Sequence, residues 1–161
     1  MTTTTHRPAT YTCFYEMPPH LIEDGGTKTW LARGANFVIA FSRVAAGAVL
    51  ARADNPDEYM VFLPNTKCTI ATPAESIEAA PDSLTIVPPG SSRITAGEEG
   101  SLVRVFSVRA ADIAGLAANR DVYAAGAAEV APLVSWPDPV GGYKLRNYRV
   151  SEYTRSGSNM R

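Results

Sequence analysis

Residues 47–63 read GAVLARADNPDEYMVFL, and residues 82–93 read DSLTIVPPGSSR. The first stretch opens with a glycine and ends in the apolar run 59–63, which has the length and composition of a buried β-strand. The second holds a short strand pattern, residues 83–87, that Pro88, Pro89 and Gly90 bring to an end. Two such strands, bounded by turn residues and with no helical pattern between them, indicate an antiparallel β-protein.

The same pattern of short strands continues on both sides of these two stretches. Proline, glycine and asparagine separate the strand patterns, and no helix interrupts them. This succession is typical of an antiparallel sandwich or barrel, so the predicted fold class is all-β. We expect strands at residues 37–44, 48–51, 59–63, 67–71, 76–79, 83–87, 92–95 and 102–108.

Two flanking regions lack the strand pattern. Residues 1–34 contain scattered prolines, glycines and aromatic residues, which predict an extended arm that packs on the domain or on a partner subunit; the alternative is a frayed terminus. Residues 35–109 form the expected barrel core. Within residues 110–161 we expect one short helix at 110–119, an extended stretch at 143–153 and a polar end that resembles a linker to a further domain.

The chain has 161 residues, a formal net charge of −1 and 45% hydrophobic residues, which suits one globular domain. The near-neutral charge argues against nucleic acid or an anionic membrane as a partner. No stretch has the pattern of a signal peptide or of a membrane-spanning helix, so we expect a cytoplasmic protein. The two cysteines, Cys13 and Cys68, are expected to be reduced thiols, with Cys68 in the core.

The stretches 47–63 and 82–93 together resemble the two motifs of the cupin superfamily. Gly47 fits the glycine that opens the first motif, and Glu58 fits its metal-binding glutamate. Pro88 and Gly90 fit the Pro-x-Gly of the second motif. The resemblance implies a cupin-type antiparallel β-barrel, the jelly roll called RmlC-like, over roughly residues 35–109.

The histidines of the cupin motifs are missing from this chain. Counted from Gly47, the His-x-His pair falls on Ala53 and Asn55; counted back from Glu58, it falls on Arg52 and Asp54. The histidine of the second motif falls on Arg93. A guanidinium repels a metal ion and pairs with carboxylates, so we predict neither a bound metal nor another cofactor. A metal site rescued by His20 is the alternative.

The altered motif still provides a set of candidate ligand-binding residues. If Glu58 points into the barrel, strand alternation places Met60 and Phe62 on the same inner side and Tyr59 on the other. Three roles remain open: a structural salt-bridge cluster, an arginine site for a small anion, or Glu58 as a general base. The candidate residues are Arg52, Asp54, Glu58, Arg93, Met60 and Phe62.

Two classes of function follow from the resemblance. The first is a metal-free cupin domain with a structural, dimerising or small-anion-binding role, which we expect to form a homodimer. Such a domain is also expected as the first barrel of a two-barrel protein. The alternative is an enzyme that acts on a small carbohydrate or carboxylate, like the cupin isomerases and epimerases, although their histidine base has no equivalent within the strands here.

Overall fold

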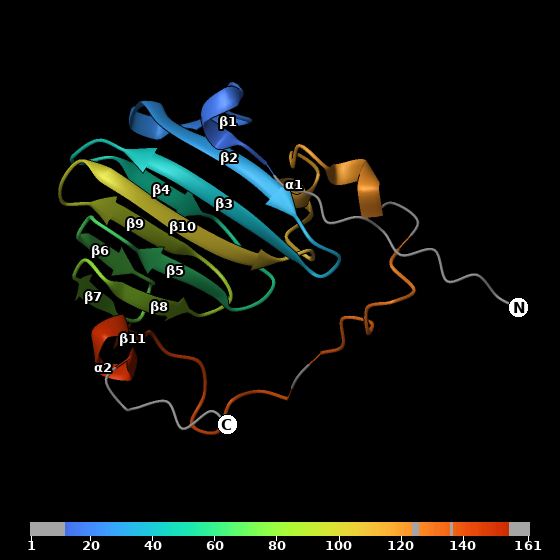
Figure 1. Ribbon diagram of the computed structural model, residues 1–161. Helices are drawn as coiled ribbons and strands as arrows, with labels where there is room; N and C mark the ends of the chain where they lie inside the picture. The colour runs from blue at the N-terminus through green and yellow to red at the C-terminus, as the bar shows by residue number, and fades with distance from the viewer. Residues whose placement is uncertain (1–11, 124–125, 136, 155–161) are drawn as a thin grey trace, which may run out of the picture.

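Two antiparallel β-sheets face each other in the computed structural model, which describes residues 12–123, 126–135 and 137–154 (Figure 1). The larger sheet has seven strands in the order β1-β2-β3-β10-β5-β8-β11, and the smaller has four in the order β4-β9-β6-β7. The chain crosses repeatedly between the two sheets, as in a jelly roll. The predicted all-β barrel is therefore confirmed.

The strands of both sheets are short, between three and eight residues long. The larger sheet is formed by β1 (Leu21–Glu23), β2 (Thr27–Arg33), β3 (Phe37–Val44), β5 (Tyr59–Leu63), β8 (Ser83–Val87), β10 (Gly100–Ser107) and β11 (Arg146–Arg149). The smaller sheet is formed by β4 (Val49–Arg52), β6 (Cys68–Ala71), β7 (Ser76–Ala79) and β9 (Ser92–Ala96). The helices are η1 (Phe14–Glu16), η2 (Asp24–Gly26), α1 (Ala111–Ala114), η3 (Arg120–Tyr123) and α2 (Val150–Thr154).

All eight strands predicted between residues 37 and 108 are present, with ends shifted by no more than two residues. Their boundaries were readable because turn residues with special backbone angles separate them. Gly47 and Gly90 both adopt positive φ, at 78° and 94°, as expected of residues without a Cβ. The loops after β4 and after β8 are joined by a reciprocal pair of backbone hydrogen bonds between Asn55 and Gly90, of 2.9 and 2.8 Å.

The segment predicted as an arm contributes two strands to the larger sheet. β2 pairs with β3 over six residue pairs, and β1 pairs with β2 at the edge of the sheet. The barrel therefore begins before residue 35. On β2, Thr29 and Leu31 are fully buried, whereas Lys28, the residue before Thr29, is exposed. Threonine does not count as hydrophobic, so this alternation does not appear in a hydrophobicity pattern. Residues 1–11 of the predicted arm lie outside the described residues.

The C-terminal region differs from its predicted outline. The helix expected at 110–119 is reduced to the four residues of α1, since its N-terminus has no side-chain cap and Gly115 follows it directly. The stretch expected to be extended at 143–153 forms β11 and then α2. The linker predicted at the end falls largely on residues 155–161, outside the described residues. Among the described helices, none has the length and hydropathy needed to cross a membrane.

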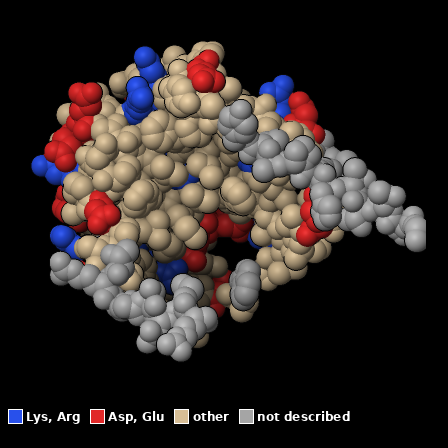
Figure 2. All heavy atoms as spheres, in the orientation of Figure 1, with Lys and Arg blue, Asp and Glu red and all other residues tan. Residues whose placement is uncertain are grey.

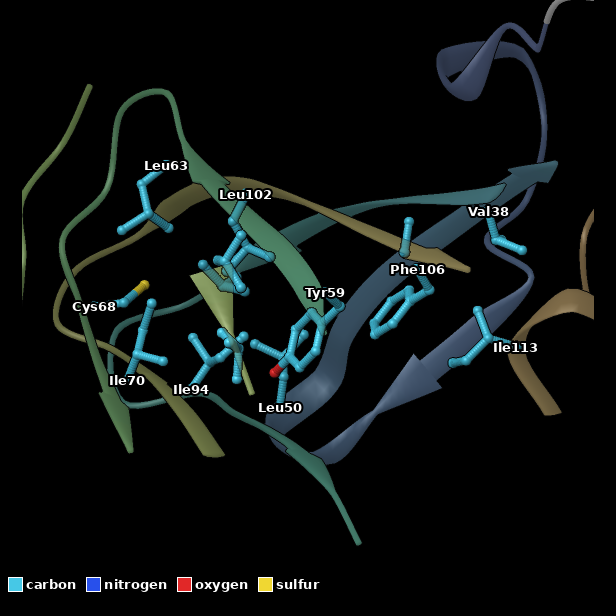
Figure 3. Packing of buried hydrophobic residues seen from close by; sticks show 14 of the residues in the cluster. Val38, Leu50, Tyr59, Leu63, Cys68, Ile70, Ile94, Leu102, Phe106 and Ile113 are labelled. Carbon is cyan, nitrogen blue, oxygen red and sulfur yellow. The ribbon is translucent and has the colours of Figure 1, made fainter. Parts of the chain in front are cut away.

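The hydrophobic core fills the space between the sheets. Leu50 and Ile94 from the smaller sheet meet Leu102 and Phe106 from β10, each 2% exposed or less (Figure 3). Ile113 of α1 belongs to the same cluster, so α1 closes one end of the barrel. Both cysteines are free thiols. The prediction of a core thiol is confirmed for Cys68, which is 1% exposed and whose pKa burial raises to about 12.

His20 fastens the start of the larger sheet. Its Nδ1 accepts a 2.8 Å hydrogen bond from the backbone N–H of Leu31, and the backbone N–H of His20 donates to the carbonyl of Thr29. The Nδ1 atom accepts only while it carries no proton, and burial lowers the pKa of His20 below its ordinary value. The stabilisation is therefore complete above about pH 6.5 and is lost as the pH falls through the lowered pKa.

We expect His20→Asn to remove this pH dependence, because the asparagine oxygen can accept the Leu31 N–H without titrating. Thermal unfolding between pH 7.5 and 5 checks it, with pH values chosen on both sides of about 6.5. The native chain should lose more thermal stability on acidification than His20→Asn does. The matched control is His6→Asn, which changes the other histidine. Equal pH profiles for the native chain and His20→Asn would contradict the assignment.

Candidate functional site

Glu58, which fits the metal-binding glutamate of the cupin motif, does not point into the barrel. Tyr59 is 2% exposed and faces the smaller sheet, so Glu58, the residue before it, lies on the outer side. There Glu58 forms a 2.6 Å ion pair with Arg146 of β11. A carboxylate held outside by a guanidinium is not placed to act as a general base on a substrate inside the barrel.

The inward and outward residues of β5 are therefore the reverse of those predicted. Tyr59, Val61 and Leu63 are buried in the core, whereas Met60 is 45% exposed and Phe62 is half-buried on the outer face. The prediction that Met60 and Phe62 line the interior is wrong. A shift of one residue at the start of a strand transfers every following side chain to the opposite face.

The second motif shows the same one-residue difference. Ser92 is buried on the inner side of β9, and Arg93, its neighbour, is exposed on the outer side between Ala51 and Ala71. Arg52 pairs in register with Ser92 rather than with Arg93. Both arginines nevertheless line one open cavity of about 420 Å³ beside β4 and β9. The predicted ligand site at these two arginines stays a prediction.

Among the predicted site residues, Arg52 is the one that reaches the barrel mouth, which is the end of the barrel closed by α1. Its guanidinium donates to both carboxylate oxygens of Asp112 on α1, at 2.5 and 3.1 Å, and lies 5.6 Å from the ring centre of Phe106. The hydrogen bond from Arg52 lowers the pKa of Asp112. Asp54 is exposed in the loop after β4. Arg52 therefore connects the barrel mouth to the helix that covers it.

A buried ion pair in the barrel interior was missed by the sequence analysis. Arg104 on β10 is 1% exposed, and its guanidinium donates to both carboxylate oxygens of Glu23, at 3.1 and 2.6 Å. Ser42 accepts a further hydrogen bond from Arg104, and Thr29 donates to Glu23. The available indication was one arginine within the apolar run 102–106, at an inward position of the strand.

Two aromatic rings lie beside the ion pair. Tyr59 and Phe106, both labelled in Figure 3, stack with ring centres 4.8 Å apart. Arg104 lies 5.7 Å from the Phe106 ring centre. The Tyr59 hydroxyl shares a 2.9 Å hydrogen bond with Ser92. Burial raises the pKa of Tyr59, so its phenol stays protonated. The interior is thus filled by stacked rings and a neutralised arginine.

The interior does not have the composition of a metal site. Among the described residues no three His, Cys, Asp or Glu side chains are placed to hold an ion together. His20, the alternative ligand, uses its Nδ1 atom on the Leu31 backbone. A cation placed near Tyr59 would meet the Arg104 guanidinium, whose only nearby carboxylate, among those described, already holds it in two hydrogen bonds.

An open groove of about 390 Å³ lies on the outer face of the larger sheet. Its apolar lining comes from β3, β5, β8, β10 and β11, and the Glu58–Arg146 ion pair lies at its side. Figure 2 shows that neutral residues occupy the middle of the face formed around β3 and β10, with a hollow below it where charged side chains appear. The apolar lining includes Phe37, Met60, Ile86, Val105 and Tyr148.

Known structures share this architecture. The structure of KdgF from Halomonas sp. matches 62% of this chain and 94% of its own, with a TM-score of 0.53 and 12% identity. An RmlC-like cupin from Shewanella frigidimarina matches 62% of this chain and 91% of its own, with a TM-score of 0.50 and 17% identity. The fold of this chain is therefore a cupin barrel. No family model matches the sequence, and no curated protein matches it either.

We expect Glu23→Gln to destabilise the fold by about 3 kcal/mol, because it leaves the Arg104 guanidinium buried without its counter-charge. Urea unfolding followed by circular dichroism measures the change in free energy. The matched control is Asp24→Asn at the adjacent, exposed position, which should cost less than about 0.5 kcal/mol. A loss no larger than that of the control would show that the ion pair contributes little.

Proposed function

We propose that this chain is a metal-free, non-catalytic cupin domain that acts as a dimerisation module, with a second copy packing on the outer face of its larger sheet. The observation that supports this proposal most is the contrast between the two sides of β5. Tyr59 inside is 2% exposed, whereas Met60 outside is 45% exposed among other apolar residues. A sealed interior favours a structural role over an enzymatic one.

The apolar residues of this face adjoin one another across the strands. In one row Met60 lies between Val105 of β10 and Ile86 of β8, and in the next Phe62 lies between Val103 and Leu84. Outward-facing apolar residues in continuous rows are unusual on a monomer surface and are typical of an interface. We name this set the open face: Phe37, Ile39, Met60, Phe62, Leu84, Ile86, Val103, Val105 and Tyr148.

A second copy suits this face better than a charged partner does. The charges at its margin balance locally, because Glu58 and Arg146 neutralise each other in their ion pair. The chain as a whole carries a net charge of −1, so two copies repel each other only weakly. An apolar centre with a polar margin is the usual composition of a symmetric interface, where each copy presents the same surface.

Binding of a small anion is the second candidate, and one observation favours it. The Nε atom of Arg52 is buried without a hydrogen-bond partner in the described structure, and the Asp112 side chain that holds this arginine is 63% exposed. A ligand carboxylate could replace such an exposed partner. An enzyme acting on a carbohydrate or carboxylate draws less support, since Glu58 lies outside the barrel and Tyr59 is sealed within it.

We expect the native chain to sediment as a dimer and Met60→Lys to shift it to the monomer, weakening association at least about 100-fold, because each interface would bury two unpaired ammonium groups. Analytical ultracentrifugation over a range of concentrations measures this. Val140→Lys, at a fully exposed apolar residue outside the sheets, is the matched control and should leave the dimer intact. A native chain that stays monomeric would refute the proposal.

Metal analysis of the purified chain tests the metal-free part of the proposal separately. We expect iron, manganese, nickel and zinc to be far below one equivalent, because the interior holds a buried guanidinium and, among the described residues, no cluster of metal-ligating side chains. Loading with each metal should leave the midpoint of thermal unfolding unchanged. One tightly bound equivalent, or a clear stabilisation by any of the four ions, would contradict it.

A further inference from the structure

A cavity of about 710 Å³ lies on the other part of the larger sheet's outer face, between β2, β3 and the segment before β1. Trp30 and Phe41 project from adjacent strands, and Phe14 of the N-terminal segment stacks on Phe41 at 5.3 Å with the two rings nearly parallel. The Trp30 indole N–H donates to the Met17 carbonyl at 2.9 Å. This hydrogen bond holds the segment across the sheet and keeps the cavity walls in place.

Four aromatic side chains line the cavity, namely Phe14, Tyr15, Trp30 and Phe41. Trp30 and Phe41 lie 6.1 Å apart with their planes inclined by 43°, so the two rings form a corner rather than a stack. Tyr15 also lines the cavity and is 81% exposed, which leaves its ring free to contact a ligand. Walls of this kind suit a planar ring, which can lie against one aromatic face and meet the edge of another.

Two cations lie at the side of the same cavity. Lys28 of β2 is directly opposite Arg43 of β3 in the register of the sheet, and both side chains are exposed on the outer face. Directly opposed residues have Cβ atoms about 5 Å apart, and like charges there destabilise the pair. Neither cation forms a salt bridge with a described residue. Glu99 is the one acidic residue among the described residues that line the cavity.

We infer that this cavity binds a small aromatic anion, a planar ring that carries a carboxylate or phosphate group. The ring lies against Tyr15 and Phe41, with the largely buried Trp30 (7% exposed) behind them in the wall, and the anionic group lies between Lys28 and Arg43, where it relieves their repulsion. A cationic ligand is excluded by the same two side chains, although aromatic walls alone would accept one. The volume of the cavity lies within the usual range for small-molecule sites.

The site is separate from the proposed dimerisation surface. The cavity is built on β2 and β3 under the N-terminal segment, whereas the open face centres on β5, β8 and β10. Ligand binding therefore requires no second copy, and a chain that proved monomeric would still bind. The inference stands or fails independently of the proposed function.

Trp30 provides the means of measurement, because it lies in the cavity wall and is one of only two tryptophans. In a Trp136→Phe background, all tryptophan fluorescence comes from Trp30. We expect benzoate and phenyl phosphate, the two probes, to change this fluorescence saturably. Benzamide lacks the charge and acetate lacks the ring, so each should bind at least about tenfold more weakly than benzoate. The relative affinities of benzoate and phenyl phosphate distinguish a carboxylate site from a phosphate site.

Variants that each remove one positive charge, made in the Trp136→Phe background, test where the anionic group binds. Arg43→Gln and Lys28→Gln should each weaken benzoate binding about tenfold, while Arg149→Gln, at an exposed arginine of β11, should leave it unchanged. Arg43→Gln should unfold at the same temperature as the parent protein or higher, because it removes the repulsion from Lys28. Absence of saturable binding by both anionic probes, or equal affinities in Arg43→Gln and Arg149→Gln, would overturn the inference.

Discussion

The ion pair between Arg104 and Glu23 determines what this barrel can contain. A guanidinium that is 1% exposed is tolerated only with a counter-charge and hydrogen-bond acceptors, and Glu23, Ser42 and Thr29 form that environment. Glu23 belongs to β1, at the edge of the larger sheet, so the buried charge and the N-terminal hairpin require each other. The pair also places a fixed positive charge in the interior, an environment unsuited to a metal cation.

Closure of the barrel mouth depends on a second arginine. Arg52 lies at the end of β4 and reaches Asp112, while Ile113, the next residue of α1, inserts into the core beside Phe106. Each contact alone would hold a four-residue helix weakly, since so short a helix has little stability of its own. The ion pair and the buried isoleucine fix α1 together. The mouth is thus closed by the chain itself, and the interior rings lose contact with solvent.

The strands could be predicted from the sequence, but which of their side chains point into the barrel and which point outward could not. Turn residues mark where β5 and β9 begin, yet apolar residues occupy both faces of β5, so its composition does not reveal which face is inner. The motif match placed Glu58 and Arg93 inside, where the structure has Tyr59 and Ser92. The β1–β2 hairpin was missed because its inner face is rich in threonines, one of which, Thr29, donates to the Glu23 carboxylate that holds the buried Arg104.

The alternation of inner and outer side chains along the strands also explains why the cavity and the open face lie outside the barrel. The inner face of the larger sheet is occupied by the ion pair and the rings, so the outer positions of its strands are the ones left for contact with other molecules. The N-terminal segment divides that outer face: near β2 it borders aromatic residues beside Lys28 and Arg43, and beyond β3 it leaves Met60 exposed. One half is thus a cavity with two cations at its side, and the other is an open groove with an apolar lining. The cavity and the open face therefore lie on two parts of the same outer sheet face.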